Sequence, residues 1–506
     1  MPLSQGHEFI KQKKFKEAYD FFNKYLIDEL HPEIQKTEAL FYKGVCLTEL
    51  KIPDEAIKVF KKLKNINPKI SFIHGTLINH MIKVCDWEFY QNDYEKLIDS
   101  INKDIKIIPT FTSLLMCGSE ELQLKVAKLW AREKYHSTNP QVLQPYSRHS
   151  RRIRIGYFSS YFRQHPVSTL MAELYELHNR NEFEIFAFSY GEQKDDVMSK
   201  RIKLSVDHFI NVADQSDLEI ANLARKNEID IAIDLNGTGE GNRSLIFSHR
   251  VAPIQIGYMY AGTMATNYID YLIADETVIP ESSKKFYSEN ILYLPNCYMV
   301  RDSKLTIAKL NNTREELGLL KDNFVFCCFN QSSKISPETF DSWCRILNRV
   351  DRGVLWLLED SPITSKNLKL EAEKRLINPD RIIFTKRMVQ SYYLALYKFA
   401  DLFLDTLPYN AHTTAGDALW ADLPVLTCFG TTYAGRVAAS HLKAIQLPEL
   451  ITYSRDEFEK VAVELANDRE KLKSIKDKLI ANKKTAPLFD TVLFVKNFEE
   501  RLKQLL

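Results

Sequence analysis

From residue 150 onward, short apolar segments alternate with segments of helical periodicity, and this alternation limits the possible folds more than any other feature. The apolar segments are residues 154–158, 183–188, 230–235, 254–258 and 291–294 in a first series, and residues 324–329, 354–358, 381–384, 400–404 and 425–428 in a second. Helical patterns such as residues 167–177, 218–226 and 337–348 lie between them. Short apolar strands between helices predict parallel α/β sheets. Two successive doubly wound units predict a cleft between two lobes, with ligands beyond the carboxyl ends of the strands.

Residues 1–145 are helical in character and carry a weak internal repeat. Phe-Lys-Glu-Ala-Tyr-Asp-Phe-Phe at residues 15–22 is echoed by Pro-Asp-Glu-Ala-Ile-Lys-Val-Phe at residues 53–60. The pair resembles tetratricopeptide helix pairs, although its offset of 38 residues, from residue 15 to residue 53, exceeds the usual period of about 34. We interpret this region either as a groove for a peptide or as a helical layer that packs on the next domain.

A basic stretch with proline and serine at residues 144–152 marks a domain boundary. The chain is therefore predicted to contain a helical tetratricopeptide-like domain (1–145), an N-terminal Rossmann-like lobe (150–310) and a C-terminal Rossmann-like lobe with terminal helices (320–506). The predicted fold class of the two lobes is α/β, and an α-helical domain precedes them in the chain.

Composition excludes several classes of function. The 68 basic and 66 acidic residues nearly cancel, so no general field attracts nucleic acid or an anionic membrane. The eight cysteines show no metal-ligand spacing and are expected to be reduced and buried. Residues 1–14 are polar, and no apolar run reaches the roughly 18 residues of a membrane span. We expect a cytoplasmic protein without nucleic-acid or membrane partners.

The segment at residues 405–417 offers the strongest candidate site, because an apolar strand leads there into a helix with a polar first turn. Unpaired N–H groups and the helix dipole at that turn would hold a pyrophosphate, with further donors from His412, Thr413 and Thr414. Asp417, one turn further, could accept from ribose hydroxyls. The alternative is an ordinary helix start, with Thr414 as N-cap and Asp417 completing a variant capping box.

Other candidates also follow predicted strands. Lys334 could neutralise charge that builds on a departing diphosphate, or it could be a solvated surface lysine. His165 precedes a proline at a predicted helix start and could be a base, a polar clamp or a capping residue. Arg436 is a cleft candidate, although arginine is common on helix surfaces. The chain has no Asp-x-Asp pair, so a divalent metal that carries the diphosphate is not expected.

Taken together, these segments resemble the O-GlcNAc transferase family, including its bacterial SPINDLY-like members. The resemblance covers residues 150–490, and it depends on three blocks: Asn-Gln-x-x-Lys-Ile at 330–335, Tyr-Asn-Ala-His-Thr-Thr at 409–414, and Arg-Val-Ala-Ala-Ser at 436–440. It implies two Rossmann-like lobes of the GT-B type. It also implies metal-independent, inverting transfer from UDP-GlcNAc to a protein Ser or Thr.

The resemblance also implies a role for individual residues. Lys334 would stabilise the leaving UDP with help from Gln331, while His412, Thr413 and Thr414 would cradle phosphates and Asp417 would bind ribose. His165 would be an active-site residue. Further residues implied at the donor site are Gly262 and Thr263 near the sugar, Tyr393 near the uracil in place of the family's histidine, and Arg436. Ala261 stands where the family usually has proline.

The sequence therefore predicts a glycosyltransferase that moves GlcNAc from UDP-GlcNAc onto protein hydroxyls, with the sugar nucleotide as co-substrate and no separate cofactor or metal. A related enzyme that uses UDP-glucose or GDP-fucose is one alternative. A helical-repeat scaffold with a non-catalytic α/β module is another.

Overall fold

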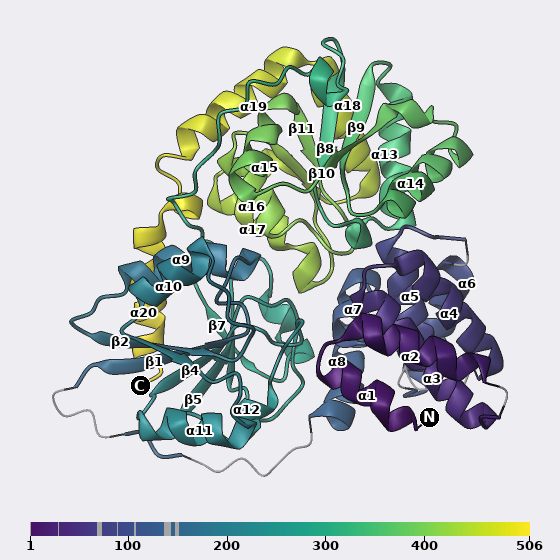
Figure 1. Ribbon diagram of the computed structural model, residues 1–506. Helices are drawn as coiled ribbons and strands as arrows, with labels where there is room; N and C mark the ends of the chain where they lie inside the picture. Colours follow the sequence, from purple (N-terminus) through teal and green to yellow (C-terminus); the bar gives the residue numbers. More distant parts are fainter. Residues whose placement is uncertain are drawn as a thin grey trace.

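The structure is a computed structural model that describes residues 2–28, 30–67, 73–88, 90–105, 108–135, 143–146 and 151–506. A helical region lies beside two α/β lobes, each built on a parallel sheet (Figure 1). The predicted fold class is confirmed. None of the helices in the described part of the chain is long and apolar enough to cross a membrane.

In the helical region before the first strand, helices that follow one another along the chain pack together. Its helices are α1 (Leu3–Lys11), α2 (Phe15–Ile27), α3 (Glu33–Glu49), α4 (Pro53–Ile66), α5 (Ile73–Lys83), α6 (Tyr90–Asn102), α7 (Thr110–Met116) and α8 (Glu120–Lys134). The repeat seen in the sequence is also present in the packing. A Cβ at Gly6 would lie 2.5 Å from the ring of Phe22, and a Cβ at Gly44 would lie 2.5 Å from the ring of Phe60. Each glycine therefore lets the next helix approach closely, at the same offset of 38 residues.

The first lobe contains a seven-stranded sheet with the order β3-β2-β1-β4-β5-β6-β7, in which every pair is parallel. Its strands are β1 (Ile153–Ser159), β2 (Phe183–Ser189), β3 (His208–Asn211), β4 (Ile231–Asp234), β5 (Ile254–Gly257), β6 (Tyr271–Ala274) and β7 (Asn290–Tyr293). Its helices are α9 (Pro166–Leu177), α10 (Val197–Ser205), α11 (Asp217–Lys226) and α12 (Leu245–Ser248).

The second lobe contains a six-stranded parallel sheet with the order β10-β9-β8-β11-β12-β13. Its strands are β8 (Phe324–Cys328), β9 (Gly353–Glu359), β10 (Ile382–Lys386), β11 (Leu402–Leu404), β12 (Val425–Cys428) and β13 (Ile451–Thr452). The helices of this half of the chain are α13 (Pro337–Arg349), α14 (Pro362–Lys374), α15 (Gln390–Leu396), α16 (Thr413–Trp420), α17 (Val437–Ala444), α18 (Arg455–Asn467), α19 (Arg469–Asn482) and α20 (Thr491–Lys503).

The last helix returns to the first lobe, although the sequence grouped all terminal helices with the second. Figure 1 shows the chain running from α19 to α20, which packs against α9. Buried His178 bonds Glu499 through Nδ1 at 2.9 Å, and the Thr491 hydroxyl donates to the Arg301 carbonyl at 2.8 Å. The carboxyl-terminal helix thereby joins the two lobes.

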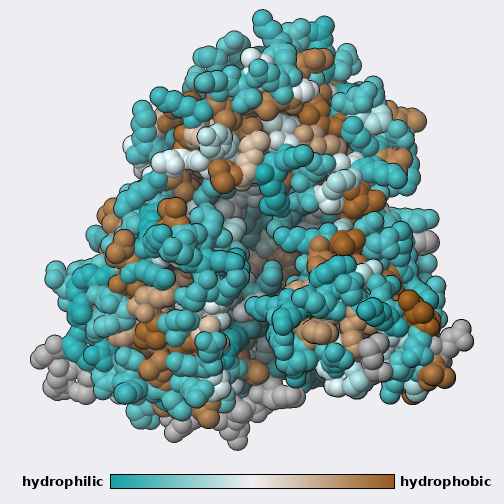
Figure 2. Space-filling model, in the orientation of Figure 1, coloured by the Kyte–Doolittle hydropathy of each residue, from teal (hydrophilic) through white to brown (hydrophobic). Residues whose placement is uncertain are grey.

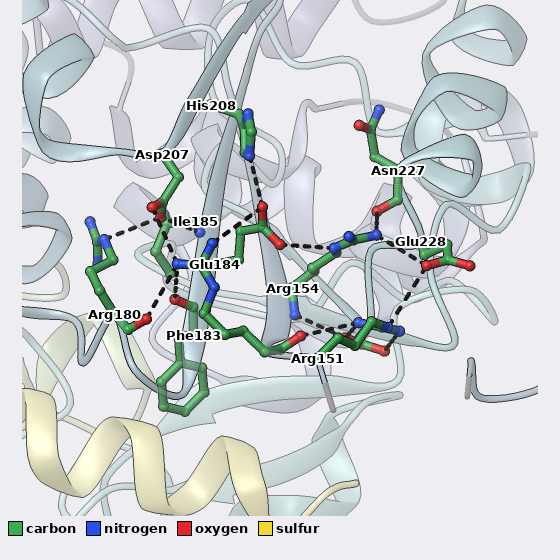
Figure 3. A network of polar contacts seen from close by, with 12 residues as sticks. Arg151, Arg154, Arg180, Phe183, Glu184, Ile185, Asp207, His208, Asn227 and Glu228 are labelled. Atoms are coloured by element: carbon green, nitrogen blue, oxygen red, sulfur yellow. Dashed lines mark hydrogen bonds and ion pairs between the residues drawn. The ribbon is translucent and has the colours of Figure 1, made fainter. Parts of the chain in front are cut away.

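A network of charged side chains closes the amino ends of the strands in the first sheet (Figure 3). Arg154 donates to Glu184 at 2.9 Å and to Glu228 at 3.1 Å, and Arg151 pairs with buried Asp230 at 2.8 Å. These carboxylates are satisfied by protein partners at the edge opposite the carboxyl ends of the strands. The network therefore stabilises the lobe and leaves the other edge for ligands.

Candidate functional site

The candidate site lies at the carboxyl ends of β8 and β11, which are neighbours in the second sheet. The loop after β8 carries Asn330 and Lys334, and the loop after β11 leads into α16. The Asn330 side-chain amide donates to the Thr406 hydroxyl at 2.9 Å and ties the two loops together. Figure 2 shows a deep hollow where the lobes and the helical region meet.

Lys334 is held between these two loops by groups of the second one. Its Nζ donates to the Asn410 carbonyl at 2.8 Å and lies 4.3 Å from the centre of the Tyr409 ring. Burial lowers the pKa of Lys334 to about 8, against an opposing effect of Asp405. The alternative of a solvated surface lysine is therefore wrong, because this ammonium is partly desolvated and fixed by two contacts.

The helix α16 begins with an open N-terminal turn. Its N-cap is His412, whose side chain makes no capping bond, so the alternative in which Thr414 caps the helix is wrong. The side chains of Thr413 and Thr414 are half-buried in this first turn. Such a turn offers backbone N–H groups and the positive end of the dipole to an anion.

His412 is fixed beside Lys334. Its Nε2 donates to the Ala434 carbonyl at 3.1 Å, and its ring stacks on Tyr409 with centroids 4.4 Å apart. Burial and then the charge of Lys334 hold the pKa of His412 well below its usual value. The imidazole is therefore neutral at physiological pH, and its Nδ1 is the nitrogen left for a ligand.

Asp417 has a protein partner that sequence reasoning missed. Its Oδ1 accepts from Nη2 of Arg301 at 2.6 Å, and Nη1 of the same arginine donates to the Thr413 carbonyl at 3.2 Å. Arg301 and Asp417 are 2% and 5% exposed, so the pair is buried. Only Oδ2 is left for a ribose hydroxyl. Arg301 follows no strand pattern and stands in no motif that would have marked it.

We expect Gly416→Ala to destabilise the protein by about 1–3 kcal/mol, although alanine normally favours a helix. A Cβ at this position would lie 2.5 Å from Cζ and Nη1 of Arg301, whose side chain is held by Asp417 and cannot easily move. Thermal unfolding of the variant measures the effect. Ala418→Gly in the same helix is the control for helix propensity, and an unchanged or raised midpoint for Gly416→Ala would contradict the packing argument.

His165 is the N-cap residue of α9. Its Nδ1 accepts from the Val167 N–H at 3.2 Å, and its ring stacks on Tyr161 at 3.8 Å. Burial and nearby Arg163 lower the pKa of His165 to about 4. Because Nδ1 accepts a bond, the neutral ring carries its proton on Nε2. This arrangement suits a capping residue that donates from Nε2 better than a general base.

The remaining donor-site candidates are in different surroundings. Gln331 is exposed on the loop before Lys334. Gly262 has a φ of 122°, a conformation that favours glycine, whereas the Thr263 hydroxyl turns inward to Glu289 at 2.6 Å. Tyr393 is half-buried on α15 and shares a 2.7 Å bond with Tyr397. Of the three side chains in this group, only that of Gln331 has no hydrogen bond to another described residue.

Arg436 does not have the place in a cleft that the sequence suggested. Its Nη1 pairs with Glu120 of α8 at 3.1 Å and also bonds Ser283 of the first lobe at 3.3 Å. Its Nε and Nη2 donate to the carbonyls of Gly430 and Thr431 in the second lobe. All three guanidinium nitrogens are engaged, so Arg436 fastens the helical region and both lobes together.

In the part of the chain that the structure describes, no group of three or more His, Cys, Asp or Glu side chains could hold a metal ion. All eight cysteines are free and buried, as the sequence predicted.

The chain is similar in sequence to known proteins. A family model described as Glycosyl transferase family 41 matches residues 84–312 and 303–498. A probable UDP-N-acetylglucosamine–peptide N-acetylglucosaminyltransferase, SEC, of Arabidopsis thaliana is 39% identical over 356 residues, covering 69% of this chain and 36% of that protein. A UDP-N-acetylglucosamine–peptide N-acetylglucosaminyltransferase of Caenorhabditis elegans is 24% identical, covering 83% of this chain and 48% of that protein. This chain spans less than half the length of both relatives.

Among solved structures, a mutant of the O-GlcNAc transferase of Thermobaculum terrenum is similar over nearly the whole chain. The TM-score is 0.81 at 25% identity, and the match covers 99% of this chain and 96% of that one. The sequence resemblance is thus confirmed by the family model, by relatives and by the fold. The chain belongs to glycosyl transferase family 41.

Proposed function

We propose that the protein transfers GlcNAc from UDP-GlcNAc to Ser or Thr hydroxyls of a polypeptide. The proposal depends on one observation: the Lys334 ammonium and the open N-terminus of α16 lie at the same edge of the second sheet. The Asn410 carbonyl, which accepts from Lys334, belongs to the loop that leads into α16. The ammonium and the positive end of the helix dipole are two sources of positive potential, and together they would stabilise the negative charge of a diphosphate. The relatives from Arabidopsis thaliana and Caenorhabditis elegans are named for this donor and a peptide acceptor, which supports the proposal.

In the proposed mechanism, the acceptor oxygen attacks the anomeric carbon from the side opposite UDP. The new carbon–oxygen bond forms while the bond from that carbon to the β-phosphate oxygen breaks, and the configuration inverts. Lys334 and the first turn of α16 stabilise the negative charge that develops on UDP, which is the role a metal ion has in other transferases. The acceptor proton passes to solvent or a base, and His165 holds its own proton on Nε2.

The acceptor would enter at the hollow where the helical region meets both lobes (Figure 2). The helical region contacts the loop of Lys334 directly, because the Ser332 hydroxyl donates to the Lys83 carbonyl at 2.6 Å. This contact supports the interpretation of the region as a layer packed on the next domain. We propose that the protein acts in the cytoplasm, where UDP-sugars and reduced cysteines occur together.

Calorimetry with UDP-GlcNAc, UDP-glucose and GDP-fucose, followed by mass spectrometry of an acceptor peptide library, tests the proposal. We expect selective binding of UDP-GlcNAc and a gain of one GlcNAc per modified hydroxyl. A preference for another donor would replace the donor assignment. Absence of binding to all three nucleotides would favour the non-catalytic scaffold.

The rate of transfer is expected to fall as pH rises through about 8. The pKa of Lys334 is lowered by burial to about 8, so the amine is mostly protonated at pH 7 and mostly neutral at pH 9. Only the protonated form stabilises the leaving diphosphate, so activity is present below this pKa and is lost above it. The pH dependence of kcat/KM for the donor reports on the free enzyme. A plateau that continues to pH 10 would contradict the role of Lys334.

A further inference from the structure

We propose that Asp405 is a positioning residue for sugar transfer: its buried carboxylate fixes the loop that holds Lys334 and supplies the counter-charge that keeps Lys334 protonated. The inference rests on the proposed function, because it concerns how the group at the diphosphate site is held in place. Neither the motifs of the sequence nor the matches to known proteins assign a role to this residue.

The carboxylate of Asp405 is fully engaged within the protein. It follows β11 directly and is 4% exposed. Oδ1 accepts from the Ala411 N–H at 2.6 Å and from the Thr406 N–H at 2.7 Å, while Oδ2 accepts from the Thr427 hydroxyl at 2.6 Å. Both ends of the loop from Thr406 to Ala411 are therefore bound to one side chain, which in turn is anchored on β12.

Within this loop, further bonds fix the carbonyl that Lys334 uses. The Asn410 side-chain amide donates to the Thr406 carbonyl at 2.8 Å, and the Asn410 N–H donates to the Ala434 carbonyl at 2.8 Å. The Thr406 hydroxyl donates to the Tyr409 carbonyl at 2.7 Å. Because the loop is closed by Asp405, the Asn410 carbonyl has one position, and the Lys334 ammonium 2.8 Å away is placed with it.

Asp405 is also the carboxylate whose charge acts on Lys334. Among the described residues, Lys334 has no ion pair within 4.0 Å, and after burial the charge of Asp405 is the largest influence on its pKa, in the raising direction. The other titratable groups are Cys328, His412 and Tyr409 near Lys334, and Cys428 and Arg455, which line the same small cavity as Asp405.

Burial raises the pKa of Asp405 to about 6, so the carboxylate is ionised at the pH where Lys334 must keep its proton. Cys328 and Tyr409 are neutral near pH 7, because burial raises the pKa of both groups. His412 is neutral there too, because its pKa lies well below its usual value. Asp405 therefore supplies the negative charge in this group of side chains.

The test compares Asp405→Asn with Thr427→Val. Asparagine keeps the shape and can still accept from Ala411, but it removes the charge at every pH, whereas Thr427→Val removes one hydrogen bond and keeps an ionisable carboxyl group, with its pKa raised further by the loss of that bond. For Asp405→Asn we expect the basic limb of kcat/KM to move down by about one pH unit, which is about a fivefold loss at pH 8 and about a tenfold loss at pH 9 and above. Activity should return when the pH is lowered toward 6.5. Thr427→Val should keep the parental basic limb.

A merely structural role would lower activity by the same factor at every pH, and that result would overturn the proposal. If Asp405→Asn does not yield folded protein, Asp405→Ser removes the same charge with a smaller side chain. The pKa of Lys334 can also be measured without an activity assay. The Lys334 amine is acylated at a series of pH values, and mass spectrometry reads the extent of labelling with Lys366 as internal reference. A parental enzyme that transfers no sugar would overturn the proposed function, whereas a labelling profile unchanged by the substitution overturns only the role of Asp405.

Discussion

Replacing Lys334 by alanine is expected to lower kcat for sugar transfer by about 100- to 1000-fold. The reason is electrostatic. The ammonium is fixed by the Asn410 carbonyl and the Tyr409 ring at the carboxyl ends of β8 and β11, where it costs no reorganisation when charge develops on UDP. In this partly desolvated setting, a single charge contributes more than it would in water. Initial rates with UDP-GlcNAc and an acceptor peptide give the measurement.

The matched control is Lys366→Ala, which removes an exposed lysine on α14 and should leave kcat unchanged. Calorimetry separates binding from chemistry. UDP should still bind to Lys334→Ala, though more weakly, because the first turn of α16 is intact. A Lys334→Ala enzyme as active as the parent would show that another group stabilises the leaving diphosphate.

Arg301→Met is expected to destabilise the protein by about 3–5 kcal/mol. Arg301 comes from the segment after β7, and its guanidinium is buried against Gly416 and paired with Asp417 of α16. Removing it leaves the Asp417 carboxylate buried without its partner, and burial already raises the pKa of that carboxyl. The first turn of α16 also loses the bond from Arg301 to the Thr413 carbonyl.

A double-substitution cycle distinguishes this cause from a loss of packing. Asp417→Asn removes the buried charge, so Arg301→Met with Asp417→Asn should recover much of the stability lost in Arg301→Met alone. Arg352→Met is the control, because its pair with Asp322 is exposed and should contribute at most about 1 kcal/mol. Equal unfolding midpoints for the Arg301 and Arg352 variants would contradict the assignment.

The strands and helices that the sequence indicated are those with strong local patterns. Buried parallel strands such as β1, β8 and β9 are continuous apolar runs, which local hydrophobicity reveals. Of the strands that escaped prediction, β3 is an edge strand with exposed ends and β13 has two residues. β6 is a buried apolar run as long as β5, so neither its length nor its hydrophobicity explains why it was missed. The pairing of all three strands depends on a neighbouring strand that lies elsewhere in the chain.

The same division holds for the candidate site. Lys334, His412 and Thr413 follow strand ends, and parallel topology brings such positions to one edge, so the sequence by itself determined the family, the fold and the place of the candidate site. Tertiary structure alone decided that Arg301 pairs with Asp417, that Asp405 closes the loop holding Lys334, and that Arg436 joins three parts of the molecule. The physical reason is that these partners lie in different segments of the chain. A charged residue's partner is set by how the segments pack, and no local pattern records it.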